Sequence, residues 1–127
     1  MVGAELATNP GASDRLRDGV TRVDEAMVER VEEELARYEA GVTLGNEFIV
    51  PGETRVSAAL ELARTVVRRA ERRAIALRRD GLVPGEWLVP YLNRLADLVW
   101  VLARAAEAAE QRPSTRVPSR LRSPQET

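Results

Sequence analysis

Apolar residues recur every three or four positions in three stretches of the chain, and each stretch predicts an amphipathic helix. The first runs from about residue 21 to residue 40, where Thr21 or Asp24 can cap the start and Gly41 marks the end. Its apolar stripe consists of Val23, Met27, Val31, Leu35 and Tyr38. A single stripe on an otherwise charged helix predicts burial of one face.

The second predicted helix covers about residues 54–80 and ends at Gly81. Its apolar residues step alternately by four and three positions, which is a heptad-like seam. The seam consists of Val56, Leu60, Ala63, Val67, Ala70, Ala74 and Leu77. Because most of these side chains are small or β-branched, we expect a neighbouring helix to pack closely against the seam.

The third predicted helix covers about residues 90–111, with Pro90 in its first turn and Pro113 beyond its end. Its apolar stripe consists of Leu88, Leu92, Leu95, Val99, Leu102 and Ala106, and it is widened by Leu98 and Trp100. Three helices with one apolar stripe each predict an all-α helical bundle over residues 21–111.

The segments around these helices lack such a period. Residues 1–20 are interpreted as a flexible leader and the Pro- and Ser-rich residues 112–127 as a disordered tail. A connector over residues 41–52 ends in the apolar run 48–50 followed by Pro and Gly. No partner strand is visible in the sequence, so we expect this run to lie extended across the helices.

The composition excludes several kinds of chemistry. The 127 residues, enough for one domain, include no Cys and no His, and all 19 basic residues are Arg. This excludes disulfides, thiolate or imidazole metal sites, Ser-His-Asp triads and Schiff-base lysines, and we expect no metal site. A net charge of −1 predicts no nucleic-acid partner, and no apolar run is long enough for a signal peptide or a membrane span. A cytoplasmic protein with no membrane partner is expected.

Charge is distributed unevenly between the first two helices. Residues 24–39 carry a net charge of −5, whereas residues 62–80 carry +5. The two helices could therefore pair sign to sign, within one chain or across subunits.

The densest polar cluster lies along one side of the second predicted helix. It consists of Glu61, Arg64, Arg68, Glu71 and Arg72. Two guanidinium groups one turn apart suit a polyphosphate or several carboxylates, because each can bind such oxygens in pairs. The alternative is a solvated basic face joined by ion pairs three or four residues apart.

Three further residues carry candidate roles. Asn93 lies beside the apolar stripe of the third helix, where a buried amide must be hydrogen-bonded. It could fix the register of the bundle or contact a ligand. Asp97 is expected to pair with Arg94 or with an Arg of the second helix. Phe48 is the only Phe of the chain, and as a large apolar side chain it could plug the core.

Four ordered segments resemble the C-terminal half of the PduO-type cob(I)alamin (corrinoid) adenosyltransferases. They are F-I-V-P-G at residues 48–52, A-R-T-V-V-R-R-A-E-R at 63–72, Y-L-N-R-L-A-D-L at 91–98 and V-L-A-R at 101–104. The family shows similar segments in this order and at nearly these spacings. The resemblance covers about residues 20–106.

The resemblance implies a five-helix bundle that assembles as a trimer, a homo-oligomer with ATP and its Mg²⁺ bound between subunits. Such enzymes transfer the adenosyl group of ATP to the cobalt of a reduced cobalamin and release triphosphate. By resemblance, Arg68, Glu71 and Asn93 help to hold ATP. Phe48 and Arg64 are the catalytic candidates: Phe48 would face the lower side of the corrin and displace its lower ligand. In the family, Arg64 pairs with an acidic residue of the N-terminal region.

Several departures from the family pattern leave three functions open. Residues 1–20 contain neither the T-(R/K)-x-G-D-x-G-x-T stretch that wraps the triphosphate nor the V-D-E-L-N helix, so we expect uncovered apolar surface. Glu53 replaces the second Gly of P-G-G, and Glu61 stands where His is usual. The chain could be an adenosyltransferase, working alone or with a second chain that supplies the missing segment. It could instead be a non-catalytic corrinoid- or nucleotide-binding or interaction module, or a repurposed pocket for another anionic substrate.

Overall fold

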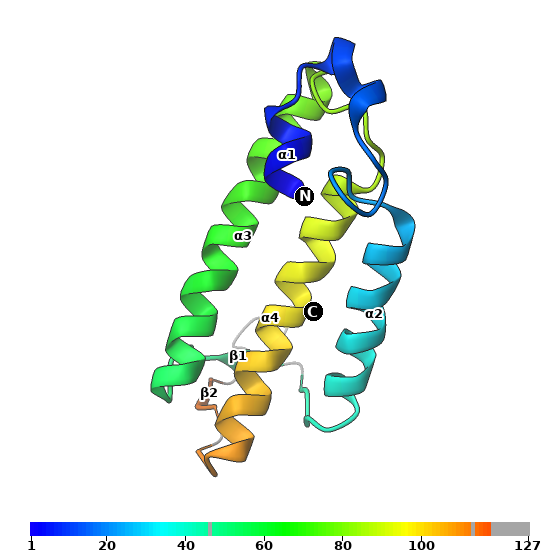
Figure 1. Cartoon of the computed structure of the whole chain (residues 1–127). Coiled ribbons are helices and arrows are strands. Elements are labelled where there is room, and N and C mark those ends of the chain that lie inside the picture. Colours follow the sequence, from blue (N-terminus) through cyan, green and yellow to red (C-terminus); the bar gives the residue numbers. More distant parts are fainter. Residues whose placement is uncertain (46, 113, 118–127) are drawn as a thin grey trace, which may run out of the picture.

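Three long helices form a single layer in the computed structural model, which describes residues 1–45, 47–112 and 114–117. They are α2 (Glu25–Glu39), α3 (Arg55–Arg79) and α4 (Leu88–Ala109), and α4 lies between the other two (Figure 1). The all-α class predicted from the sequence is confirmed. None of the helices in the described ranges is long and apolar enough to cross a membrane.

Local sequence features determine where the long helices begin and end. Asp24 caps α2, and its carboxylate accepts a hydrogen bond from the Met27 N–H. Thr54 and Ser57 form a reciprocal capping box at the start of α3. Gly81 follows α3 with a φ of +73°, a left-handed conformation that glycine adopts without strain. The predicted helix limits therefore agree with the structure to within a few residues.

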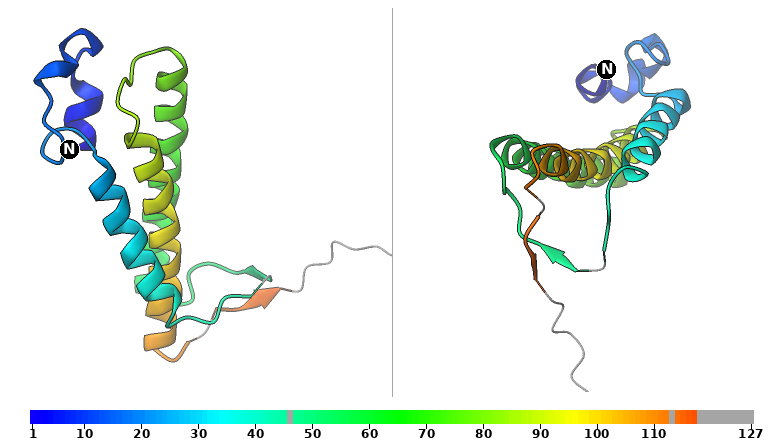
Figure 2. Two further views of the ribbon diagram at one scale, coloured as in Figure 1. Left: turned by 90° about the vertical axis from the view of Figure 1, so that its right-hand side faces the viewer. Right: turned by 90° about the horizontal axis from the view of Figure 1, so that it is seen from below.

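The central position of α4 explains why more of it is buried than one stripe predicts. A helix with a neighbour on each side has two packing faces, so its burial cannot follow a single stripe. The buried residues of α4 are Leu88, Val89, Leu92, Ala96, Val101, Ala103, Arg104 and Glu107. The same arrangement makes the predicted pairing of the acidic and basic helices wrong within the chain, because α4 separates α2 from α3 (Figure 2).

The main apolar core lies where the N-terminal ends of α2 and α4 meet the C-terminal half of α3. Its buried members are Val23, Met27, Ala74, Val83, Leu88, Val89 and Leu92. Of the predicted α3 seam, Val67 and Ala70 pack against this core, whereas Val56 is exposed. The seam is therefore packed over only part of its length.

Residues 1–20 are more ordered than a flexible leader. They contain α1 (Val2–Ala7) and the 3₁₀ helix η1 (Pro10–Arg15), which lie toward one face of the helix layer (Figure 2). The buried Glu5 carboxylate accepts a hydrogen bond of 2.9 Å from the Val23 N–H, just before α2. The interpretation as a loose leader is wrong because this buried contact ties α1 to the start of α2.

The apolar run in the connector forms a strand, which corrects a second expectation. β1 (Phe48–Ile49) pairs antiparallel with β2 (Arg116–Val117), with Phe48 opposite Val117. The two strands project from the face of the layer opposite α1 (Figure 2). The predicted disordered tail thus contains a strand, while residues 113 and 118–127 lie outside the described residues.

Candidate functional site

Two adjoining pockets lie over α4, with walls contributed by α2 and α3, and together they are called the α4 groove. The larger has a volume of about 430 Å³ and the smaller about 210 Å³, and Arg94 borders both. The larger is lined by Val28, Glu32, Glu71, Arg78, Trp87, Val89, Pro90, Asn93 and Arg94. The smaller is lined by Leu35, Glu39, Arg64, Arg94, Asp97, Trp100 and Val101. Both pockets combine guanidinium groups, carboxylates and an indole ring.

Glu71 and Asn93 line the larger pocket, and Arg68 joins them through a hydrogen bond to Glu71. Glu71 is buried, and its Oε2 accepts a hydrogen bond of 2.7 Å from Arg68 while its Oε1 accepts one of 2.9 Å from the Asn93 amide. The cost of burying a carboxylate is offset by these two hydrogen bonds, which are charge-assisted because the acceptor is a carboxylate. Because the Arg68 side chain is 42% exposed, its guanidinium group can reach a ligand while it stays paired with Glu71.

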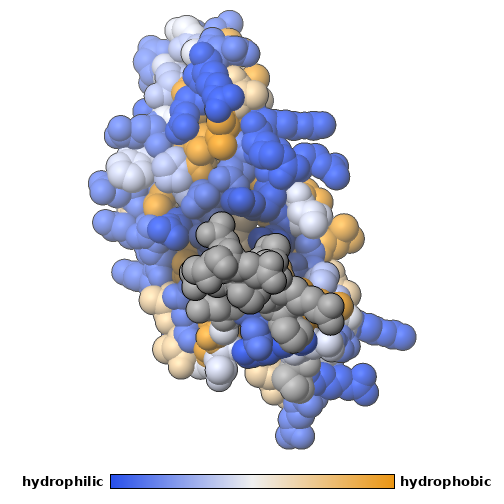
Figure 3. All heavy atoms as spheres, turned by 180° about the vertical axis from the view of Figure 1, so that it is seen from behind, coloured by the Kyte–Doolittle hydropathy of each residue, from blue (hydrophilic) through white to orange (hydrophobic). Residues whose placement is uncertain are grey.

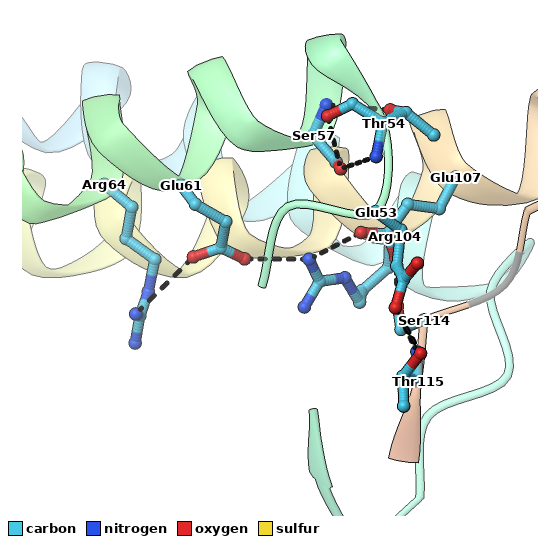
Figure 4. A network of polar contacts seen from close by, with 9 residues as sticks. All are labelled: Glu53, Thr54, Ser57, Glu61, Arg64, Arg104, Glu107, Ser114 and Thr115. Atoms are coloured by element: carbon cyan, nitrogen blue, oxygen red, sulfur yellow. Dashed lines mark hydrogen bonds and ion pairs between the residues drawn. The ribbon is translucent and has the colours of Figure 1, made fainter. Parts of the chain in front are cut away.

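Arg64 lies in the smaller pocket, about one turn before Arg68. Its guanidinium group is 4.0 Å from Glu61 Oε2, a loose ion pair on one helix. Glu61 is held more tightly from the other side, since its Oε1 accepts a hydrogen bond of 2.8 Å from Arg104 of α4. Figure 4 shows the Glu61, Arg64 and Arg104 side chains on the same side of the helices as the two strands.

Arg94 joins α4 to α2 along the groove. Its guanidinium group lies 3.2 Å from Asp97 on its own helix and 3.2 Å from Glu32 of α2. The expected pairing of Asp97 with Arg94 is confirmed. Arg72, by contrast, is exposed on α3, and among the described residues it makes no hydrogen bond to the cluster, so the structure does not bring it in.

Phe48 is not a core plug, because 64% of its surface is exposed. The structure places it on β1, apart from the residues that line the α4 groove. A large apolar ring left in solvent gains little from its position in the isolated chain. Its exposure leaves the ring accessible to a ligand or to another chain.

The sequence interpretation missed a polar network at the far end of α3 and α4. Arg104 pairs with Glu61 and with Glu107 at 3.1 Å, and Arg104 and Glu107 are both buried (Figure 4). The Ser114 hydroxyl donates to the other Glu107 oxygen. The spacing of three residues between Arg104 and Glu107 is a sequence feature that could have indicated this pair.

One face of the molecule is mainly polar. Seen from behind, hydrophilic residues occupy most of the visible surface, and apolar residues gather in separate patches (Figure 3). The guanidinium groups of Arg64, Arg78 and Arg94, which line the groove, are suited to a charged ligand.

Comparison with known proteins identifies the family of the chain. The sequence model of the family described as Cobalamin adenosyltransferase matches residues 1–106, so the match begins earlier than residue 20. A corrinoid adenosyltransferase of Mycobacterium bovis is 42% identical over 87 residues, which are 67% of this chain and 45% of that protein. One from Citrobacter freundii is 36% identical over 107 residues, which are 84% of this chain and 58% of that protein.

A solved structure shows the same fold. A variant PduO-type ATP:corrinoid adenosyltransferase from Lactobacillus reuteri, complexed with cobalamin and ATP, superposes with a TM-score of 0.80 and 31% sequence identity. The match covers 93% of this chain and 61% of that chain. The chain thus spans about half the length of the curated relatives it matches. The family match over most of its residues and the shared helical fold show that the chain belongs to the cobalamin adenosyltransferase family.

Proposed function

We propose that the α4 groove binds ATP, with its Mg²⁺, and that the chain takes part in transferring the adenosyl group of ATP to the cobalt of a reduced cobalamin. The observation that carries this proposal is the preassembled Arg68–Glu71–Asn93 cluster, of which Glu71 and Asn93 line the larger pocket. These are the residues that the family resemblance assigns to ATP. A related structure is complexed with both cobalamin and ATP.

The chemistry assigns a separate task to each residue. In the reaction a cobalt–carbon bond forms at the 5′ carbon of ATP, the carbon–oxygen bond breaks, and triphosphate leaves with the released electron pair. Arg68 and Arg64 would stabilise the negative charge that develops on triphosphate. Asn93 would orient the nucleotide, and the exposed ring of Phe48 would face the lower side of the corrin and keep its lower ligand away.

The proposed active unit is larger than one copy of this chain. Large apolar side chains of α3 are exposed, and a soluble assembly must cover such a stripe. They are Val56, Leu62, Val66 and Leu77, here called the α3 stripe. We propose that a homo-oligomer, a trimer by analogy with the family, or a second chain with the triphosphate-wrapping segment covers it. A cytoplasmic location is part of the same proposal.

An anaerobic titration of reduced cobalamin, with and without Mg-ATP, tests this function by absorbance. The proposal predicts formation of adenosylcobalamin that depends on both Mg-ATP and protein. A spectral shift without product would show that this chain alone binds the corrin and does not catalyse the transfer, which favours the binding-module hypothesis. No spectral change under either condition would overturn the proposal and favour a different anionic substrate.

A further inference from the structure

We propose that residues 114–117, here called the C-terminal strap, set the position of Phe48, and that Glu53 and Thr115 are the positioning residues that hold the strap. The role of Phe48 toward the corrin rests on the proposed function. The placement of Phe48 by the strap is independent of it.

The need for a positioning device follows from the surroundings of Phe48. Its ring is exposed, so packing against the core does not fix it. The strand that carries it has two residues, and a pair of strands this short is marginal in water without other support. Contacts outside the strand pairing must therefore keep Phe48 in place.

The strap supplies these contacts on both sides of β1. After the strand, the Val50 N–H donates a hydrogen bond of 2.9 Å to the Thr115 carbonyl oxygen. Before it, Arg116 donates a hydrogen bond of 3.0 Å to the Thr43 carbonyl oxygen and lies 3.5 Å from the Glu47 carboxylate. The strap, residues 114–117, is therefore bonded to the chain both before and after Phe48.

Glu53, just before α3, attaches the strap to the start of that helix through hydrogen bonds to Thr115. Its Oε1 accepts hydrogen bonds from both the backbone N–H and the hydroxyl of Thr115, the former at 3.2 Å (Figure 4). By resemblance, this position is the second Gly of the family segment, and glycine has no side chain to accept such bonds. The attachment through Glu53 is therefore a feature of this chain.

The strap is also anchored to the end of α4. The Ser114 hydroxyl donates to Glu107, which is fully buried and paired with Arg104 at 3.1 Å. A buried ion pair has few alternative arrangements, because separating its members leaves an unpaired charge away from water. The strap therefore runs from a rigid anchor at Glu107 to the strand that carries Phe48.

Fluorine NMR tests the strap directly, since the chain contains one Phe and 4-fluorophenylalanine gives one resonance for Phe48. Two variants weaken the attachment: Thr115→Val removes the hydroxyl, and Glu53→Gly restores the residue of the family. Thr8→Val is the matched control, because its hydroxyl bonds within the N-terminal region, to the Ala4 carbonyl oxygen. Amide exchange at Val50 is followed in the same samples.

The strap predicts that Thr115→Val and Glu53→Gly move the resonance toward its position in the denatured chain and speed exchange at Val50 at least tenfold. Thr8→Val should change neither the fluorine resonance nor the exchange at Val50. Circular dichroism should show equal helicity in the wild type and the three variants. If Thr115→Val keeps the wild-type resonance and the wild-type Val50 exchange, the proposal is overturned. If Glu53→Gly loses helicity, its result is set aside, and Thr115→Val alone decides whether the strap positions Phe48.

A second measurement links the strap to the reaction. Thr115→Val is expected to lower kcat for adenosylation severalfold, to leave the KM for ATP unchanged, and to lower the fraction of bound cob(II)alamin that has lost its lower ligand. Unchanged kcat with a shifted fluorine resonance would overturn the role of the strap in catalysis. If the wild type forms no product, the proposed function fails, whereas the fluorine experiment still decides whether the strap places Phe48.

Discussion

Glu71 shows how a single buried carboxylate can organise a binding site. Its two oxygens are divided between Arg68 on the same helix and Asn93 on α4. The pairing with Arg68 was predictable, because residues three apart on a helix are neighbours. The contact with Asn93 was not, since the sequence shows only that an amide at a helix interface needs a partner.

Replacing Arg68 tests whether this cluster holds the nucleotide. Arg68→Ala should weaken Mg-ATP binding by tenfold to a hundredfold, about the value of one or two charge-assisted hydrogen bonds. Titration calorimetry measures the affinity, and circular dichroism should show unchanged helicity. The control is Arg73→Ala, on the exposed side of α3. Equal loss of affinity in the two variants would mean that general positive charge, and not the cluster, attracts the nucleotide.

The carboxyl group of Glu53 gives the strap a dependence on pH. Hydrogen bonds from the side chain and backbone of Thr115, and the charge of Arg112, hold the pKa of Glu53 below its ordinary value of 4.5. Because the pKa of Glu53 is lower in the folded state, its ionised carboxylate stabilises the strap at pH values above the ordinary pKa. This stabilisation is lost as the pH falls through the lowered pKa.

An acid titration of the Phe48 fluorine resonance measures this effect. We expect the resonance to stay constant from neutral pH to below 4.5 and then to move toward the denatured position. In Thr115→Val the change should begin at a higher pH. The account of Glu53 is contradicted if wild type and variant titrate at the same pH.

At the scale of elements, the long helices were predictable and the short ones were not. Asp24 and Gly81 gave the limits of α2 and α3 because capping depends on a few neighbouring residues. β1 and β2 have two residues each, too few for any period, and they pair across more than sixty positions of sequence. α1 has six residues, too few to show a period, and it is placed by distant contacts such as the Glu5 hydrogen bond to Val23 and the packing of Val2 against the core.

Gly85 tests how α1 is attached. A Cβ at this position would lie 2.0 Å from Glu5 Oε1, so any side chain there must displace the buried carboxylate. Gly85→Ala should lower the free energy of unfolding by about 1–3 kcal/mol, as expected for overpacking. Chemical denaturation measures the loss, and Gly3→Ala is the control, because a Cβ at Gly3 meets nothing within 4 Å. Equal stability of the two variants would show that the Glu5 contact is dispensable.

For the whole molecule, the sequence predicted an all-α bundle with three long helices and left open which helix lies in the middle. Each stripe predicts one buried face, which is compatible with a closed bundle as well as with a layer. Only the structure shows that α4 occupies the middle, so that α3 packs against it with Glu61, Glu71 and Ala74, while the α3 stripe is exposed. The expectation of uncovered apolar surface is confirmed.

Association through the α3 stripe can be tested with one charged side chain. Leu62→Glu should weaken self-association or partner binding at least tenfold, because burying a Leu is worth about 1.5–3 kcal/mol. Light scattering after size-exclusion chromatography measures the assembly, and circular dichroism should show an intact helix. Thr65→Glu is the control, since it adds the same charge at an exposed polar position of α3. Loss of assembly in both variants, or in neither, would contradict a role for the stripe.

We propose that the α4 groove holds ATP near a corrin that meets Phe48. Amide NMR spectra recorded with Mg-ATP, followed by paramagnetic cob(II)alamin and the Phe48 fluorine resonance, test it most directly. We expect Mg-ATP to shift signals from Arg64, Arg68, Glu71 and Asn93, and cob(II)alamin then to broaden the single fluorine line. Shifts confined to other surfaces, or an unbroadened fluorine line with cobalamin bound, would contradict it.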